Sequence, residues 1–282
     1  MSGIGTGPEW TSVAVGRTET RVLQGGPPQA SEAVVFIHGN PGSAADWEGM
    51  VTAVSSSWRA VAFDLPDFGQ TVAGEGFDNT VLEYAEFVGM AIEALGVSRA
   101  HLVLHDFGGP IGLVWASLNP DRVASVALIN TGILEGYRWH TMARVWQTPV
   151  LGELAQLATV RQVFSRVVPG AEPRGLPREF VAEMYDNFDR RTRAAVLKLY
   201  RDAKDLGAQS GQIADLLAGA DHPAMVIWGA EDSYIPLRFA EAQKRAFPSA
   251  RIEVIPDSGH WPFVDSPGEV SRLLEAHLAR VS

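Results

Sequence analysis

The chain has 282 residues, of which 46% are hydrophobic and 20% are charged. This composition predicts a soluble globular protein with a sizeable core, not a disordered chain. The absence of cysteine excludes disulfides, thiolate metal sites and a cysteine nucleophile. Lys and Arg number 23 against 33 Asp and Glu, and the net charge of −10 argues against nucleic acid as a partner.

The N-terminal segment has no basic start followed by an apolar block, and no apolar run is long enough to cross a bilayer. We therefore expect a cytoplasmic protein with no signal peptide and no membrane partner, either a monomer or a homodimer. Gly3, Gly5 and Gly7 could suggest a dinucleotide-binding loop. No strand precedes them, so we reject that interpretation.

Short apolar runs typical of buried strands alternate with longer amphipathic stretches typical of helices. The predicted strands cover residues 33–37, 58–63, 100–104, 123–129, 224–228 and 251–255, and the predicted helices cover residues 82–95, 110–118, 237–247 and 267–280. A helix end is expected at Gly96, a typical C-terminal capping residue. This alternation predicts an α/β fold with a mostly parallel sheet covered by helices on both faces.

The middle of the chain has a different pattern. Residues 144–158 and 191–204 are amphipathic, and no convincing strand occurs between residues 132 and 221. We interpret residues 133–221 as a helical cap inserted into a core made of residues 1–132 and 222–282. The alternative is that this segment continues the same α/β domain.

The segment from Leu102 to Pro110, LVLHDFGGP, combines a strand, a tight turn with one acidic residue, and two glycines that lead into a helix. This is the pattern of a nucleophile elbow, with Asp106 as the nucleophile. Small residues must follow such a strained turn so that strand and helix can approach. The helix N-terminus would stabilise negative charge on Asp106. Taken alone, the pattern also fits an ordinary helix-capping Asp.

Three other loops that follow predicted strands carry motifs of interest. Residues 38–42, HGNPG, can offer backbone N–H groups to an oxyanion. Asp232 follows the strand at 224–228, where it can orient a histidine, and His260 follows the strand at 251–255. The chain order of nucleophile, acid and histidine is that of the α/β-hydrolase template.

With these motifs, the sequence resembles the α/β-hydrolase superfamily over nearly its whole length. An aspartate nucleophile is typical of its epoxide hydrolase and haloalkane dehalogenase branch. The resemblance implies that Asp106 is the nucleophile, His260 the base and Asp232 the supporting acid. It implies an oxyanion hole formed by the backbone N–H groups of Asn40 and Phe107. It implies no metal and no organic cofactor, only a small substrate and water.

An aspartate nucleophile fits one kind of chemistry. A carboxylate is already charged at neutral pH and can attack an sp³ carbon to give an alkyl–enzyme ester, which a histidine-activated water then cleaves. Glu135 is a rival for the supporting acid, but the run around Asp232 matches the commoner family pattern. We expect His38 and His105 to position neighbouring groups.

The epoxide hydrolase and haloalkane dehalogenase branches differ in the residues that interact with the leaving group. Haloalkane dehalogenases usually hold halide with a Trp directly after the nucleophile and a second Trp or Asn. Asn40 fits that pattern, but Phe107 has no ring N–H, so Trp139 or Trp146 would have to substitute. Leu104, where epoxide hydrolases usually have Gly, also favours the dehalogenases.

Epoxide hydrolases instead protonate the ring oxygen with tyrosines from the cap. The candidates are Tyr137, Tyr185 and Tyr200, and Tyr200 in LYRD resembles the family's cap tyrosine most. Asn40 replaces the aromatic residue usual in the HGxP turn of that family. We favour epoxide hydrolysis, because a missing halide donor is harder to replace than a turn residue.

The aromatic residues of the cap and its surroundings suggest a small apolar substrate. The expected substrate-binding residues are Trp47, Trp139, Trp146 and Trp261, with Phe68 as a further candidate. A function of another class stays open, because some proteins of this fold are ligand receptors or non-hydrolytic biosynthetic enzymes.

Overall fold

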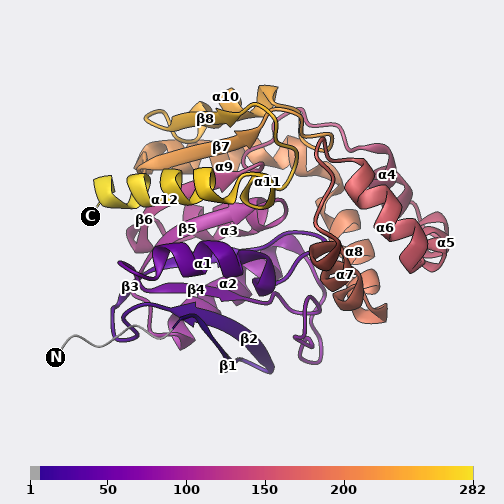
Figure 1. Ribbon diagram of the computed structural model, residues 1–282, viewed down its shortest axis with the longest axis horizontal. Helices are drawn as coiled ribbons and strands as arrows, with labels where there is room; N and C mark the ends of the chain where they lie inside the picture. Colours follow the sequence, from indigo (N-terminus) through magenta and orange to yellow (C-terminus); the bar gives the residue numbers. More distant parts are fainter. Residues whose placement is uncertain (1–6, 282) are drawn as a thin grey trace.

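A computed structural model describes residues 7–281 of the chain. Within that range one eight-stranded sheet forms the centre of the molecule, in the order β1-β2-β4-β3-β5-β6-β7-β8 (Figure 1). The strands are β1 (Glu9–Val15), β2 (Thr18–Gly25), β3 (Glu32–Ile37), β4 (Ala60–Phe63), β5 (Arg99–His105), β6 (Val123–Ile129), β7 (Ala224–Gly229) and β8 (Arg251–Ile255). The pairings β1–β2 and β2–β4 are antiparallel and the others are parallel, which confirms the predicted mostly parallel sheet.

Helices cover both faces of this sheet. They are α1 (Glu48–Val54), α2 (Val81–Ala94), α3 (Gly108–Leu118), α4 (Thr141–Gln147), α5 (Leu151–Ala158), α6 (Arg161–Gly170), α7 (Arg178–Asn187), α8 (Arg190–Asp202), α9 (Leu206–Ala220), α10 (Arg238–Ala242), α11 (Pro262–Asp265) and α12 (Pro267–Val281), with 3₁₀ turns at Ala44–Trp47, Pro120–Arg122, Ala203–Asp205 and Gln243–Arg245. Helices α1 and α12 pack together on one face, and α2, α3 and α9 pack on the other (Figure 1). The predicted α/β-hydrolase fold class is confirmed.

All six predicted strands are present. Continuous apolar runs are a strong signal for strands buried on both faces. Every residue of β6, for example, is buried, whereas β8, at the edge of the sheet, is mostly exposed or half-buried. Of the predicted helices, only the one at 237–247 differs clearly, since α10 ends at Ala242 and a 3₁₀ turn follows. Gly96 has a φ of +67°, as a residue just after a helix end requires.

The hairpin of β1 and β2 was not predicted. Strand β1 is mostly exposed or half-buried, β2 mixes buried with half-buried and exposed residues, and both include polar side chains, so the hairpin lacks the continuous apolar signal. Val15 pairs with Thr18 across a two-residue turn, and Gly16 supplies the positive φ that such turns need. Gly3 and Gly5, rejected above as a dinucleotide-binding loop, lie outside the described residues.

The middle segment contains helices and loops but no strand, as predicted. Helices α4 to α8 lie together at one end of the molecule (Figure 1). Helix α9, at the end of the predicted cap, packs instead against α3. The division into a core and a cap of residues 133–221 remains a prediction. Within the described range, no helix is both long and apolar enough to cross a membrane.

Candidate active site

Asp106 lies in a strained turn between β5 and α3. Its φ is +48°, in the left-handed region that non-glycine residues rarely adopt. A Cβ on Gly108 would lie 2.3 Å from the carbonyl oxygen of Ile37, and one on Gly109 would lie 1.9 Å from the Thr131 hydroxyl. Only glycine fits at these two positions, so the elbow inferred from the sequence is the local structure.

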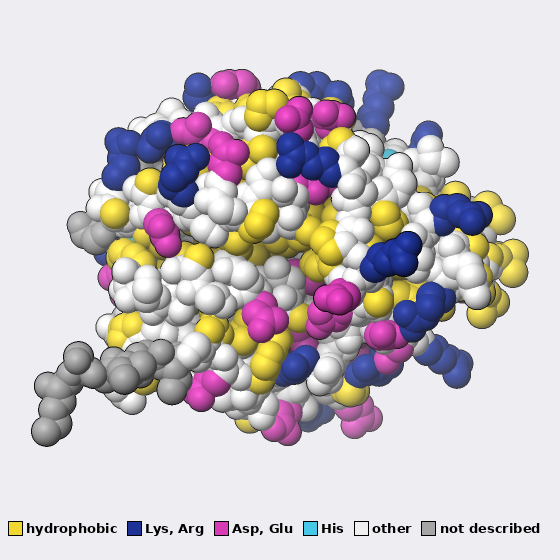
Figure 2. Space-filling model, viewed as in Figure 1, with side chains coloured by type: hydrophobic (Ala, Val, Ile, Leu, Met, Phe, Trp, Pro, Cys, Tyr) yellow, Lys and Arg dark blue, Asp and Glu magenta, His cyan; other side chains and the backbone are white. Residues whose placement is uncertain are grey.

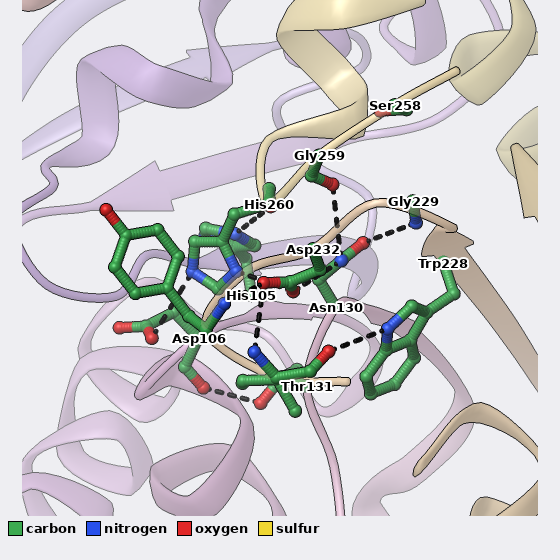
Figure 3. A network of polar contacts seen from close by, with 12 residues as sticks. His105, Asp106, Asn130, Thr131, Trp228, Gly229, Asp232, Ser258, Gly259 and His260 are labelled. Carbon is green, nitrogen blue, oxygen red and sulfur yellow. Dashed lines mark hydrogen bonds and ion pairs between the residues drawn. The ribbon is translucent and has the colours of Figure 1, made fainter. Parts of the chain in front are cut away.

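Three of the predicted site residues form one polar network at the carboxyl ends of the strands (Figure 3). His260 Nδ1 lies 2.8 Å from Asp232 Oδ2, and His260 Nε2 lies 3.5 Å from Asp106 Oδ2. The backbone N–H of Asn40 donates to Asp106 Oδ1 at 2.7 Å. With Asn40 included, these four residues come from four different loops, and they meet because parallel strands end at one edge of the sheet.

Asp232 is held firmly in place. Its Oδ1 accepts hydrogen bonds from the backbone N–H groups of Tyr234 and Ile235, at 2.7 and 2.9 Å. Its Oδ2 accepts one from Asn130 Nδ2 at 2.6 Å (Figure 3). With His260 as a further partner, this buried carboxylate has the contacts needed to fix the orientation of the imidazole ring.

The charges of these groups stabilise one another. Burial alone would raise the pKa of the Asp106 carboxyl, but the hydrogen bond and charge of His260 outweigh it and lower the pKa to about 2. Burial alone would lower the pKa of His260, but Asp232 and Asp106 raise it to about 10. Each of these groups therefore favours the charged form of its neighbour.

The other two histidines near Asp106 are buried and neutral. Burial lowers the pKa of His38 to about 4 and that of His105 to about 3. His38 accepts from the backbone N–H of Leu65 at 3.0 Å, and His105 Nε2 lies 2.8 Å from the carbonyl oxygen of His260. Each therefore bonds to the backbone of a loop at the site, which is the positioning geometry expected for both.

Glu135 does not reach the site. Its carboxylate forms a partly exposed ion pair with Arg245 at 3.0 Å. Asp232, not Glu135, is therefore the acid in contact with His260. Asn130, at the end of β6, was missed by sequence reasoning. Its amide joins Asp232 to the backbone of Gly229, and only its position after a strand could have indicated it.

An apolar pocket opens in front of Asp106 and His260. Most of its walls come from helices α4, α6 and α8 and from the loops around them. Three of its lining residues, Met142, Val163 and Val167, are also exposed, so the pocket opens towards the outer surface of α4 and α6. Figure 2 shows apolar side chains at this end of the molecule.

Three of the four predicted substrate-binding tryptophans, Trp139, Trp146 and Trp261, line this pocket. The prediction for Trp47 is wrong, because its side chain is fully buried against Phe36 and Phe263, below the site. Phe68 is likewise buried in the core, where its ring contacts His38.

The tyrosines differ in what their hydroxyls can do. Tyr200 lines the pocket, and its oxygen accepts from Asn40 Nδ2 at 3.3 Å, which leaves its own proton free. Tyr137 also lines the pocket, but its hydroxyl donates to the carbonyl oxygen of Tyr234 at 3.0 Å. The prediction for Tyr185 is wrong, because its ring packs outside the pocket against Phe164.

The sequence analysis did not identify two residues of the pocket wall, Tyr234 and His140. Tyr234 follows Asp232 by two positions, and its ring packs against that of His260 with a centroid distance of 5.0 Å. His140 lines the pocket beside it, and burial lowers its pKa to about 4. Within the described residues, no cluster of His, Asp and Glu has the arrangement of a metal site.

The chain belongs to the α/β-hydrolase fold family, whose family model matches residues 32–267. Its curated relatives include haloalkane dehalogenases. It is 27% identical over 267 residues to haloalkane dehalogenase 2 of Mycobacterium tuberculosis, covering 87% of this chain and 86% of that one. A haloalkane dehalogenase from Bradyrhizobium elkani has the same fold, with a TM-score of 0.86 and 23% identity over 97% of this chain and 98% of that one.

Relatives of other kinds match as well. The chain is 30% identical over 262 residues to the dihydrolipoyllysine-residue acetyltransferase component of the acetoin cleaving system of Cupriavidus necator. That match covers 88% of this chain but only 64% of the relative. The chain is also 26% identical over 283 residues to a cis-3-alkyl-4-alkyloxetan-2-one decarboxylase of Xanthomonas campestris, covering 90% of each.

Proposed function

We propose that the protein hydrolyses a small apolar substrate by two displacements, the first on carbon and the second on an enzyme ester. The observation that carries this proposal is the Asp106 carboxylate, whose low pKa favours the ionised form and which lines an apolar pocket together with His260. An ionised carboxylate in such a place can attack an sp³ carbon without prior activation. No metal or organic cofactor is required.

In the first step, a carboxylate oxygen of Asp106 forms a bond to the substrate carbon, and the leaving group departs with the bonding electrons. The Asn40 N–H, 2.7 Å from Oδ1, holds the carboxylate in position. The separation of 3.5 Å between Asp106 Oδ2 and His260 Nε2 is longer than a strong charge-assisted hydrogen bond. Attack therefore does not require breaking a tight ion pair.

In the second step, water loses a proton to His260 Nε2 and adds its oxygen to the Asp106 carbonyl carbon. The bond from that carbon to the alcohol oxygen then breaks, and the alcohol takes the proton. The ester has no charge, so His260 loses one of the two partners that raise its pKa. The pKa of His260 therefore falls once the ester has formed, the ring releases the proton it held, and neutral imidazole is available to accept a proton from water. The backbone N–H of Asn40, which already donates to Asp106, would stabilise the oxyanion, and the N–H of Phe107 is the second donor that we propose.

For the leaving group we propose an epoxide oxygen, protonated by Tyr200 as the ring opens. The Tyr200 hydroxyl keeps its proton for a substrate, because its contact with Asn40 uses only the oxygen. Burial raises the pKa of Tyr200, so the phenol stays protonated at neutral pH. Ring opening would transfer this proton to the new alkoxide. Tyr137 is less suited, because its proton is already donated.

Carbon–halide hydrolysis is the second candidate, and the dehalogenase relatives favour it. Halide needs N–H donors in the pocket. Trp146 Nε1 is buried without a partner among the described residues, and Trp146 lines the pocket. Trp139 is not available, because its Nε1 donates to the carbonyl oxygen of Lys204 at 3.0 Å.

Trapping the ester tests both candidates. We expect a His260→Gln variant to accumulate an adduct on Asp106, because the second step loses its base. Intact mass measured after exposure to small epoxides, and separately to bromoalkanes, identifies the substrate. A gain of one whole epoxide supports ring opening, and a gain of the alkyl group alone supports dehalogenation. A His260→Gln/Asp106→Asn double variant is the control and should gain no mass.

Absence of any adduct from either set, with folded protein, would contradict the proposed chemistry for these substrates. It would favour the remaining alternative, a ligand-binding or non-hydrolytic biosynthetic protein. Ligand-induced changes in thermal stability would then be the measurement to make.

A further inference from the structure

A buried glutamate from the loop after α6 contacts the backbone of the candidate catalytic histidine. The side chain of Glu172 is almost fully buried, with an exposed fraction of 6%. Its Oε2 accepts a hydrogen bond from the backbone N–H of His260 at 2.8 Å. Its other oxygen, Oε1, is buried and has no partner among the described residues. Burying a carboxylate with an unsatisfied oxygen is costly, so this contact needs an explanation.

The loop that carries His260 is shaped to receive this carboxylate. A Cβ on Gly259 would lie 2.0 Å from Glu172 Oε2 and 2.7 Å from Pro173, so a larger residue would push Glu172 away. Gly259 does not have a positive φ, so the close approach of Glu172 is the structural reason for glycine here. Arg174, two residues further on, donates to the Asp265 carbonyl oxygen at 3.3 Å.

The remaining polar groups of this loop are bound by the core. The Gly259 N–H donates to Asp265 at 2.8 Å, and the Gly259 carbonyl oxygen accepts from Asn130 at 3.3 Å (Figure 3). The His260 carbonyl oxygen is bonded to His105. The remaining backbone group, the His260 N–H, donates its hydrogen bond to Glu172, which belongs to the segment between β6 and β7.

We propose that Glu172 is a positioning residue for His260 and couples the cap to the ester-cleavage step. This inference rests on the proposed function, in which His260 acts as a base only after the ester has formed. Loss of the Glu172 contact would let the His260 backbone shift relative to Asp106. A misplacement of about 1 Å can slow a catalysed step on the order of a hundredfold. The first step, which does not use His260 as a base, would keep its rate.

Three variants test this proposal. Glu172→Ala removes the acceptor, Glu172→Gln keeps an oxygen that can accept from the His260 N–H, and Glu179→Ala removes an exposed glutamate of α7 as a matched control. Rapid quenching and intact mass give the rates of ester formation and ester cleavage separately. For Glu172→Ala we expect ester cleavage to slow on the order of ten- to a hundredfold while ester formation changes little. Glu172→Gln should restore most of the cleavage rate.

A measurement without substrate separates this inference from the proposed function. Hydrogen–deuterium exchange at the His260 amide should be faster in Glu172→Ala and near wild type in Glu172→Gln. An unchanged exchange rate at the His260 amide in Glu172→Ala would contradict the hydrogen bond between Glu172 and His260, independently of any enzyme activity. Faster exchange with an unchanged cleavage rate, or equal slowing of both steps, would overturn the positioning role. If neither the wild type nor any variant forms an ester, the proposed function is wrong. The exchange rates then still show whether Glu172 protects the His260 amide.

Discussion

Replacing Tyr200 by Phe removes one oxygen atom and distinguishes an epoxide oxygen from a halide as the leaving group. The hydroxyl is the only group lost, because the ring remains packed against Phe107 and Trp146, at centroid distances of 4.8 and 4.9 Å. The hydroxyl makes one long hydrogen bond, with Asn40 Nδ2 at 3.3 Å. Its removal leaves the buried Asn40 Nδ2 without that partner, so we expect a cost of about 1–3 kcal/mol of folding stability.

The effect on catalysis should be far larger if the substrate is an epoxide. A positioned general acid contributes about 10²- to 10⁴-fold, so kcat/KM for an epoxide such as styrene oxide should fall by about that factor. Turnover of a bromoalkane should change little, because halide needs no proton to leave. Tyr185→Phe is the matched control, since that ring lies outside the pocket and both activities should be unchanged.

Steady-state kinetics with both substrates, and a thermal denaturation curve for each variant, check these expectations. Epoxide turnover that stays within about threefold of wild type in Tyr200→Phe would refute Tyr200 as the acid, since even a weak general acid contributes more. A large loss with both substrates would instead indicate that the hydroxyl shapes the pocket through Asn40.

Further predictions concern the nucleophile, the supporting acid and the charge balance of the site. Asp106→Ala should abolish turnover while circular dichroism stays native, and residual turnover near the wild-type rate would contradict the mechanism. Asp232→Asn should slow ester cleavage by about 10³- to 10⁴-fold, whereas Glu135→Gln, which alters only a partly exposed ion pair, should not. The folded-state pKa of His260, about 10, is above its unfolded value, so its contribution to stability is complete below about pH 6.5 and is lost as pH rises towards 10. Denaturant titrations at pH 6, 8 and 9.5 should thus show a steeper loss of stability in the wild type than in His260→Gln, and parallel losses would contradict the charged pair.

The parts of the site that the sequence predicts are those set by local backbone geometry. Asp106 is recognisable because its turn needs glycines directly after it, and those glycines stand in the sequence. Asp232 is recognisable because it follows a strand with a strong apolar signal, and His260 because it comes last in the chain order of nucleophile, acid and histidine. A residue at the end of a parallel strand points to a known edge of the sheet, so its place is nearly determined by the fold class.

The parts that the sequence does not predict depend on packing between distant segments. Glu172 and His260 are 88 residues apart, and no local pattern marks the glutamate as buried. Trp47 and Tyr185 were assigned to the pocket by residue type and neighbourhood alone. In the structure Trp47 is buried in the core and Tyr185 packs against Phe164 outside the pocket lining, because each helical turn buries a face that the sequence alone does not identify.

The two halves of the proposed reaction depend on different parts of the chain. The groups that make and cleave the ester, Asp106, Asp232 and His260, lie at strand ends, where backbone hydrogen bonds fix them. The candidates for handling the leaving group, Tyr200 and Trp146, lie on helices between β6 and β7, so substitutions there can change the substrate while the ester chemistry stays the same. Glu172 joins the two, since it belongs to the helical segment yet accepts a hydrogen bond from the backbone of His260. A change in the position of the loop after α6, which carries Glu172, should therefore affect ester cleavage through this hydrogen bond more than it affects the attack by Asp106.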